Sequence, residues 1–318
     1  MTPEPEEILQ FTVAKEEGTL RLDRFLALRM PDWSRSQIQR LIREGRVRVE
    51  GELPRKAGQP VETEQRILVE PVQATRKAFA EDLPLEVVFD DPEFAVVNKA
   101  AGMVVHAGAG VNSGTLVNAL LFHLGRLSTS ADQIRPGIVH RLDKMTSGLM
   151  VIAKNDGAHR KLAEQFKAKT VTKFYRVLVH GRMPENQGEI SLPVGRDRRN
   201  RVKMRAGGLA PRTALTKFEV TKRFEGFTLL RVRPETGRTH QVRVHFAARG
   251  KPVVGDTLYG APSRFWLGGR WWGTLERNFL HAEEIRFRHP STGEPLIFRA
   301  ALPEELEDFL ERLRSAAA

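Results

Sequence analysis

The segment from Pro71 to Pro84 divides the 318-residue chain into two differently patterned parts. It mixes charges with prolines at both ends and shows no sustained hydrophobic periodicity, which is typical of a linker. The part before it is short, whereas the part after it is long enough to bury a substantial core. We therefore expect a small domain over residues 18–70, a linker over 71–84 and a large domain over 85–314.

A short helix is the clearest feature of the small domain, and we expect it to begin at Ser34 and to end before Gly45. Ile38, Leu41 and Ile42 recur at helical spacing and predict its buried face. Basic and polar side chains line the opposite face and form a basic ridge: Arg35, Gln39 and Arg43. Residues 46–50 alternate as a strand, including Arg46, and residues 67–69 are the expected partner strand.

The large domain contains both strand and helix patterns, and no internal repeat is evident in it. Apolar or alternating runs predict strands at residues 85–89, 94–97, 137–142, 149–153, 174–179 and 227–232. Helical patterns occupy residues 115–124, 156–167 and 239–249, and the last of these has Thr239 as its expected N-cap. A mixed α+β domain is the consequence.

Charge and composition limit the classes of partner and of site that we expect. Lys and Arg outnumber Asp and Glu by 51 to 39, and a pI near 10.3 favours a polyanion such as nucleic acid. The chain has no cysteine, which excludes disulfides, thiolate metal sites and cysteine nucleophiles. The acidic start resembles no signal peptide and no apolar run is long enough to cross a bilayer, so we expect a cytoplasmic protein.

Asp143 lies where a polar cluster interrupts two apolar runs, in GIVHRLDKMTSGLMVIAK. Loops at strand ends commonly carry catalytic residues, although an aspartate there is also ordinary turn chemistry. In ETGRTHQVRVHF, Arg238 precedes a helix and Arg243 lies within it, so each can pair with a carboxylate or phosphate or lie on a solvated basic face. His240 and His245 are spaced unlike zinc ligands.

Three further features bear on ligands. Tyr175 lies on an alternating strand, where a tyrosine is usually a packing residue. Basic side chains concentrate in RDRRNRVKMR, a hairpin candidate, and tryptophans in RFWLGGRWWG; both suit RNA, although a charged hairpin is often only solvated and a tryptophan loop often folds onto its own domain. The glycines of HAGAG match no nucleotide-cofactor pattern, so no cofactor is expected.

Several motifs, in order, resemble the RluA family of pseudouridine synthases: NKAAGMVVHAGAG, HRLDKMTSG, KFYRVLVHG, TGRTHQVRVHF, GKPVVGDTLYG and RNFLHAEEIRF. They extend over residues 98–287. RLDRFLA and SRSQIQRLIREGRVRVEG resemble the alpha-L RNA-binding module of ribosomal S-four type. The resemblance implies an α+β fold with a small RNA-binding domain and a catalytic domain on a mixed, mostly antiparallel sheet. One departure is Ala100, where the family usually has proline after the lysine, which concerns the shape of that loop.

The resemblance also implies residue roles. Asp143 matches the aspartate that attacks the target nucleoside, whether at the sugar, at the base or through a glycal, and Arg238 matches the arginine that pairs with it. Tyr175 matches the active-site tyrosine, which stacks on the uracil or helps to remove a proton. Arg141 matches the residue that fills the space of the flipped base. RNA contacts are expected at Arg35, Gln39, Arg43, Arg46, Arg198, Arg199, Arg201 and Lys203.

The expected substrate is large-subunit ribosomal RNA or a pre-ribosomal particle, bound by a monomer without metal or small-molecule cofactor. Two alternatives keep the same architecture: a non-catalytic ribosomal RNA-binding assembly factor, and the same chemistry on transfer RNA. A hydrolase that uses Asp143 with a histidine would release the base or cleave the backbone. Asp143, Tyr175 and Arg238 together favour the isomerase.

Overall fold

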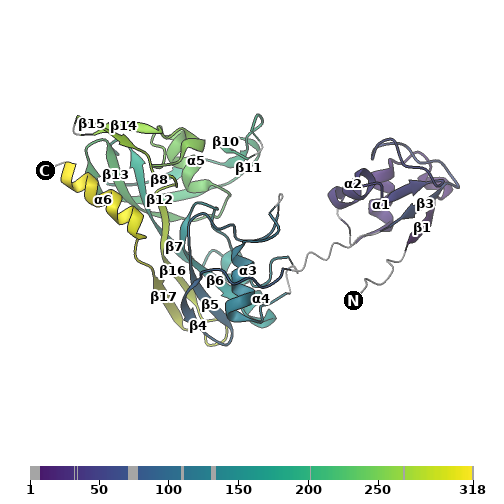
Figure 1. Ribbon diagram of the computed structural model, residues 1–318, viewed down its shortest axis with the longest axis horizontal. Coiled ribbons are helices and arrows are strands. Elements are labelled where there is room, and N and C mark those ends of the chain that lie inside the picture. Colours follow the sequence, from purple (N-terminus) through teal and green to yellow (C-terminus); the bar gives the residue numbers. More distant parts are fainter. Residues whose placement is uncertain are drawn as a thin grey trace. The chain divides into compact units, whose positions relative to one another are not determined.

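The computed structural model describes residues 8–31, 33, 35–70, 78–108, 111–129, 134–200, 202–267 and 269–316. The chain forms two compact units, Met1–Arg76 and Lys77–Ala318, and each is described by itself (Figure 1). Among the residues described, no helix is both long enough and apolar enough to cross a membrane.

The first unit packs two helices against a three-stranded antiparallel sheet of order β1-β3-β2. Its elements are β1 (Leu9–Thr12), a 3-10 helix (Lys15–Glu17), α1 (Leu22–Arg29), α2 (Arg35–Arg43), β2 (Val47–Val49) and β3 (Arg66–Val69). The pairing Val49↔Ile67 confirms the expected strand pair. Ser34, the expected start of α2, lies outside the described residues. The folded unit begins before Gly18, because β1 pairs with β3 along Leu9↔Val69.

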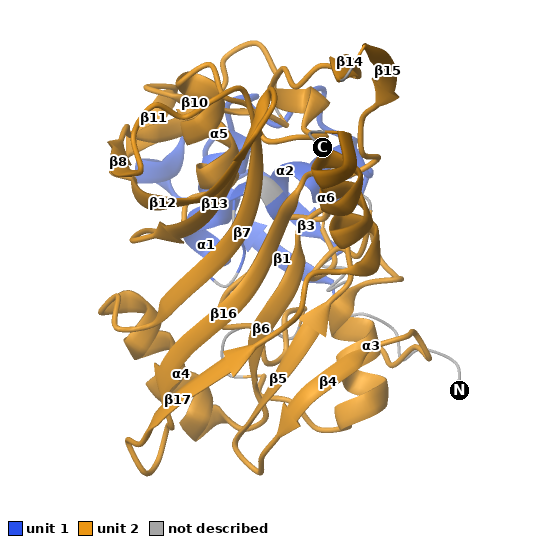
Figure 2. Cartoon of the chain, turned by 90° about the vertical axis from the view of Figure 1, so that its left-hand side faces the viewer, with its two compact units in different colours: residues 1–76 blue, residues 77–318 orange. Residues whose placement is uncertain are grey.

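The second unit is built on a nine-stranded sheet of order β4-β5-β6-β16-β7-β13-β12-β8, with β17 paired to β16 (Figure 2). The strands are β4 (Glu86–Asp90), β5 (Phe94–Lys99), β6 (Ser147–Ala153), β7 (Thr172–His180), β8 (Gln187–Ser191), β12 (Leu215–Phe224), β13 (Phe227–Pro234), β16 (Leu280–Arg288) and β17 (Pro295–Arg299). Only the β6–β16 pair is parallel among these described strands. A mixed, mostly antiparallel sheet is thus confirmed.

Two smaller sheets stand beside the large one. β9 (Val194–Arg196) lies between β10 (Met204–Ala206) and β11 (Leu209–Arg212), and β14 (Arg264–Leu267) pairs with β15 (Arg270–Gly273). Because β9 and β10 are antiparallel, with Met204 opposite Arg196, the basic run between them is a hairpin as expected. The exposed Trp266 and Trp271 pair their rings across the β14–β15 hairpin, with centroids 4.3 Å apart.

The helices of the second unit are α3 (Leu116–Leu124), α4 (Asp156–Lys167), α5 (Gln241–Ala248) and α6 (Glu304–Ala316), with a 3-10 helix at Thr257–Tyr259. Thr115 caps α3 by accepting the N–H of Asn118, and α4 has the expected bounds. The expected N-cap of α5 is wrong. His240, not Thr239, takes that position, with a left-handed backbone (φ 55°) that turns the chain into the helix.

Residues 137–142 do not form the expected strand; they make only an isolated bridge, between Ile138 and Ile152 of β6. The apolar run reflects packing across β6, since Nε2 of the next polar residue, His140, accepts the N–H of Val151. Part of the expected linker also belongs to the large unit. Asn118 of α3 donates its side-chain amide to the carbonyl of Phe79 and accepts the N–H of Glu81 at its own carbonyl.

Candidate active site

Asp143 lies on the loop that leads into β6, at a cavity of about 90 Å³. Its wall comes from three places far apart in the sequence: this loop, β7 through Tyr175, and the start of α5 through Arg243. The Asp143 side chain is 17% exposed, so its carboxylate remains reachable from the cavity. Sheet strands and a helix N-terminus thus place a partly buried carboxylate at a reachable position.

Arg243 holds the Asp143 carboxylate. Its Nη1 donates to Asp143 Oδ2 at 3.2 Å, while Nε and Nη2 donate to the two oxygens of Asp256 at 2.6 and 2.8 Å. Burial lowers the pKa of Arg243, but the bonds to Asp256 and the nearby Asp143 outweigh that effect and raise it. A guanidinium fixed bidentately by one carboxylate therefore presents its remaining edge to the other.

The expected pairing of Asp143 with Arg238 is wrong. Arg238 lines the cavity, but its Nε donates to the carbonyl of Thr213 at 3.1 Å, and it precedes α5 instead of lying on it. Position 243 lies on the first turn of α5, where its side chain reaches both Asp143 and Asp256. The motif offers two arginines that each suit a carboxylate, so the sequence did not distinguish them.

His240 and Tyr259 form a second contact set beside Asp143 that the sequence did not indicate. His240 Nε2 lies 3.9 Å from Asp143 Oδ2, and its Nδ1 lies 2.7 Å from Tyr259 Oη. Burial lowers the pKa of His240, and burial raises the pKa of Tyr259 to about 12. His240 Nδ1 and Tyr259 Oη thus share one hydrogen bond, and the other ring nitrogen, Nε2, faces Asp143.

Tyr175 forms the floor of the cavity from β7, where it pairs with Ala282 of β16 and Val232 of β13. Tyr175 is 6% exposed. Burial, and then the charge of Asp143, raise the pKa of its hydroxyl well above the usual range. Tyr175 is therefore a neutral phenol at physiological pH, and its ring, not a phenolate, is the group the site offers.

Lys99 organises the loop that follows β5 and begins at Ala100. The side chain is fully buried, and its Nζ donates to the carbonyls of Ala100, Met103 and Lys144 at 2.7 to 3.1 Å. Burial lowers the pKa of Lys99 to about 7. Because Lys144 follows Asp143 directly, these hydrogen bonds join the loop after β5 to the loop of the carboxylate, without a proline.

The basic hairpin adjoins the site. The N–H of Met204 donates to Tyr259 Oη at 2.9 Å, and Lys203 Nζ lies 5.9 Å from the centre of that ring. Arg198 and Arg199 lie on its exposed tip, and Arg201 lies outside the described residues. Arg141 is exposed at the rim of the cavity and makes no hydrogen bond or ion pair with the residues that the structure describes.

A buried carboxylate orients the basic face of the first unit. Asp23 of α1 is fully buried; it accepts hydrogen bonds from the exposed Arg21 and Arg35 and, at 2.6 Å, from Gln39. Burial alone would raise the pKa of Asp23, but these donors outweigh it and lower the pKa. The two arginines are thus fixed at the surface instead of being mobile.

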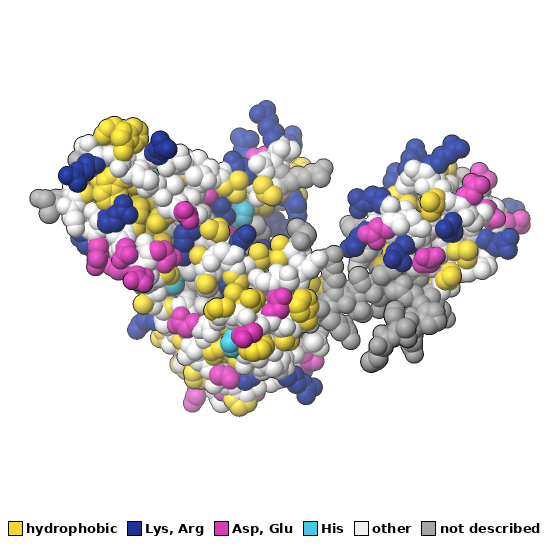
Figure 3. Space-filling model, viewed as in Figure 1, with side chains coloured by type: hydrophobic (Ala, Val, Ile, Leu, Met, Phe, Trp, Pro, Cys, Tyr) yellow, Lys and Arg dark blue, Asp and Glu magenta, His cyan; other side chains and the backbone are white. Residues whose placement is uncertain are grey.

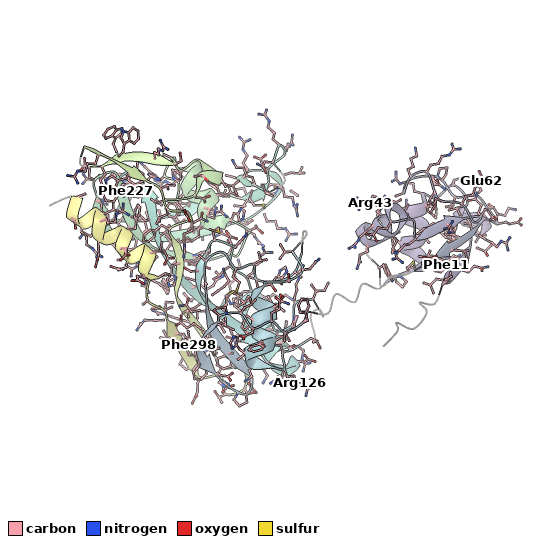
Figure 4. The ribbon with its side chains drawn as sticks, in the orientation of Figure 1. Phe11, Arg43, Glu62, Arg126, Phe227 and Phe298 are labelled. Carbon is pink, nitrogen blue, oxygen red and sulfur yellow. The ribbon has the colours of Figure 1, made fainter. Side chains whose placement is uncertain are left out.

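Other basic residues extend this face. Arg43 at the end of α2 donates to the carbonyl of Gln39, and Arg46 lies 4.0 Å from Glu70. Lys and Arg side chains line the edge of the unit where α2 lies (Figure 3), and Glu62 lies on the opposite side from Arg43 in that view (Figure 4). An exposed basic edge is the arrangement that phosphate binding needs.

Two family models match the chain, and each indicates a class of protein. A family model described as RNA pseudouridylate synthase matches residues 93–248, and an S4 domain model matches residues 20–67. Two human structures have the fold of the second unit. RNA Pseudouridylate Synthase Domain Containing 1 is 27% identical, with a TM-score of 0.54, and the match covers 74% of this chain and 97% of that one. RNA Pseudouridylate Synthase Domain Containing 4 is 25% identical, with a TM-score of 0.55, and the match covers 72% of this chain and 93% of that one.

Full-length relatives then show the family. An uncharacterized RNA pseudouridine synthase of Aquifex aeolicus is 44% identical over 303 residues, covering 94% of both chains. The ribosomal large subunit pseudouridine synthase D of Vibrio parahaemolyticus is 37% identical over 313 residues, covering 96% of this chain and 95% of that one. The chain belongs to the RluA family of RNA pseudouridine synthases, isomerases of uridine in RNA, and its first unit is an RNA-binding S4 domain.

Proposed function

We propose that this enzyme converts uridines of large-subunit ribosomal RNA to pseudouridine, with Asp143 as the nucleophile and Arg243 as its partner. The observation that carries the proposal is the ion pair between these two residues at the edge of the cavity. A hydrogen bond from a guanidinium fixes the direction in which a carboxylate points. A cavity of about 90 Å³ at that carboxylate suits a single flipped base.

The reaction is an isomerisation, so the product contains the same atoms as the substrate. In the route through the sugar, Asp143 bonds to C1′ as the bond from C1′ to N1 breaks, and the uracil turns. C5 then bonds to C1′ and displaces the carboxylate, after which C5 loses its proton and N1 gains one. Tyr175 supports the turning uracil with its ring. His240 places its Nε2 3.9 Å from the Asp143 carboxylate and forms the side of the site next to Arg243.

Arg141 fills the space that the flipped uridine leaves. It lies two residues before Asp143, at the rim of the cavity, with an exposed guanidinium and no competing ion pair among the described residues. A planar guanidinium stacks well on neighbouring bases, which offsets part of the cost of about a few kcal/mol for unstacking. The hairpin residues Arg198, Arg199, Arg201 and Lys203 would contact nearby phosphates.

Support for the ribosomal substrate comes from the named relatives, several of which are large-subunit enzymes, and the S4 domain of this chain supplies RNA binding. The test is carbodiimide mapping by primer extension on unmodified large-subunit ribosomal RNA, free and in assembling particles, with transfer RNA in parallel. We expect stops in ribosomal RNA alone. Stops confined to transfer RNA would reject the substrate, and no stops in any RNA would favour a silent RNA-binding factor.

We expect Asp23→Asn to weaken RNA binding roughly tenfold, although the substitution raises the net charge of the domain. Arg21, Arg35 and Gln39 lose a charged acceptor, so the guanidiniums are no longer held in place; one charge-assisted contact is worth about 1.4 kcal/mol. The measurement is the Kd for ribosomal RNA at fixed salt. Glu17→Gln, which weakens the contacts of Glu17 with Arg29 and with the N–H of Ala14 and leaves Asp23 unchanged, is the control. Tighter binding by Asp23→Asn would show that charge outweighs orientation.

A further inference from the structure

A second cavity, of about 420 Å³, adjoins the catalytic cavity. The two share six lining residues: Arg141, Lys173, Pro234, Thr236, Gly237 and Arg238. The second cavity, here called the flanking cavity, extends from this shared wall to the end of α4 and the start of β7. Its volume lies in the range of roughly 300–1,000 Å³ that is usual for ligand sites. The catalytic cavity alone is too small to hold more than the reacting base.

The flanking cavity is strongly basic. Arg141, Lys167, Lys169 and Lys173 line it, and none of the four pairs with a carboxylate among the residues that the structure describes. Its one acidic residue, Glu235, already binds Arg233 at 2.7 Å and lies 3.8 Å from Lys217. Burial lowers the pKa of Lys173 to about 8, which still leaves it mostly charged at neutral pH. The site therefore has positive charge to offer an anion.

One wall of this cavity is apolar and aromatic. Phe166 and His140 stack with their ring centres 4.6 Å apart, and Val139, Val171 and Pro234 complete the surface. His140 remains uncharged, because burial lowers its pKa well below the usual range. An uncharged apolar wall beside cations without carboxylate partners has the two components of a nucleotide site, one for a base and one for a phosphate.

We propose that the flanking cavity binds the nucleotide next to the target uridine on the same RNA strand. Its base lies against the wall of Phe166, Val139 and Val171, and its phosphate contacts Lys167 and Lys169. Because the two cavities share a wall, consecutive nucleotides can occupy both. The inference rests on the proposed isomerase site and adds to it: the enzyme reads the target uridine together with a neighbour, and Arg141 and Lys173 contact both.

Two pairs of variants on and after α4 test the phosphate contact. Lys167→Gln/Lys169→Gln removes two cations from the cavity. Arg160→Gln/Lys161→Gln removes two exposed cations of the same helix that do not line it. On an RNA fragment that the wild type modifies, we expect the first double variant to raise KM about tenfold with kcat unchanged, and the control to change KM by less than about threefold. Equal effects of the two double variants would overturn the proposal.

The base contact has its own test. Fragments carrying an abasic nucleotide immediately 5′ or 3′ of the intact target uridine are compared in kcat/KM with the full fragment. We expect one of them to lose about tenfold with the wild type and little with Val171→Phe, which fills the cavity. No loss with either fragment would overturn the proposal. If Val171→Phe fails to fold, the wild-type fragment series and the lysine variants still decide.

These outcomes are distinct from failure of the proposed function. If the enzyme modifies transfer RNA and not ribosomal RNA, both tests of the flanking cavity can be carried out on transfer RNA. If the wild type modifies no RNA, the isomerase proposal fails by itself. The Kd of the two double variants for ribosomal RNA then measures the flanking cavity, and equal affinities would reject it.

Discussion

Asp143→Asn is expected to lower kcat for pseudouridine formation by at least about 10⁴-fold, while RNA affinity stays within about threefold. The amide has the size of the carboxylate and can still accept from Arg243, but it is not a nucleophile. Arg243 keeps its bidentate partner Asp256, so the substitution does not leave this guanidinium without a carboxylate. The fold should therefore survive.

The measurement is single-turnover conversion of a ribosomal RNA fragment, with Kd measured separately. Asp82→Asn is the matched control, because Asp82 is exposed and its side chain makes no hydrogen bond or ion pair with the described part of the chain. The control should retain full activity. If the single-turnover rate of Asp143→Asn is within tenfold of the wild-type rate, Asp143 is not the nucleophile. If the variant no longer binds the RNA fragment, Asp143 has a structural role.

The fold was predictable where periodicity alone decides structure. Runs such as Phe94 to Val97 are strands buried in the sheet, and the amphipathic α4 has the bounds that its pattern predicts. Residues 137–142 show why such reasoning fails locally. Ile138 and Val139 are apolar because they pack beside β6 and Phe166, a tertiary reason that a local pattern does not distinguish from strand pairing.

The site was predictable in part. The sequence indicated Asp143, Tyr175 and Arg141, and the structure places all three at one cavity, although their roles stay proposals. The ion-pair partner was misassigned because Asp143 and Arg243 are separated by 100 residues, and both arginines of the motif suit a carboxylate. Only the position of Asp256, which anchors Arg243, distinguishes them. His240 was weighed only as a metal ligand.

The two arginines of this motif can be separated directly. Arg243→Lys is expected to lower kcat about 10²- to 10³-fold, because one ammonium cannot bind both oxygens of Asp256 and still donate to Asp143. Arg238→Lys is the matched change in the same cavity and should lower kcat/KM less than tenfold, since its Nε contacts only the carbonyl of Thr213. The measurement is steady-state kcat and KM on the same RNA fragment.

The two arginine variants should differ in whether kcat or KM changes. An arginine that aims the nucleophile acts in the transition state, so Arg243→Lys should lower kcat and kcat/KM together, whereas an arginine that only binds RNA should raise KM. Asp256→Asn should lower kcat less than Arg243→Lys, because it loosens the guanidinium without removing it. A larger loss of kcat in Arg238→Lys than in Arg243→Lys would reverse the assignment and place the partner of Asp143 before α5 instead of on it.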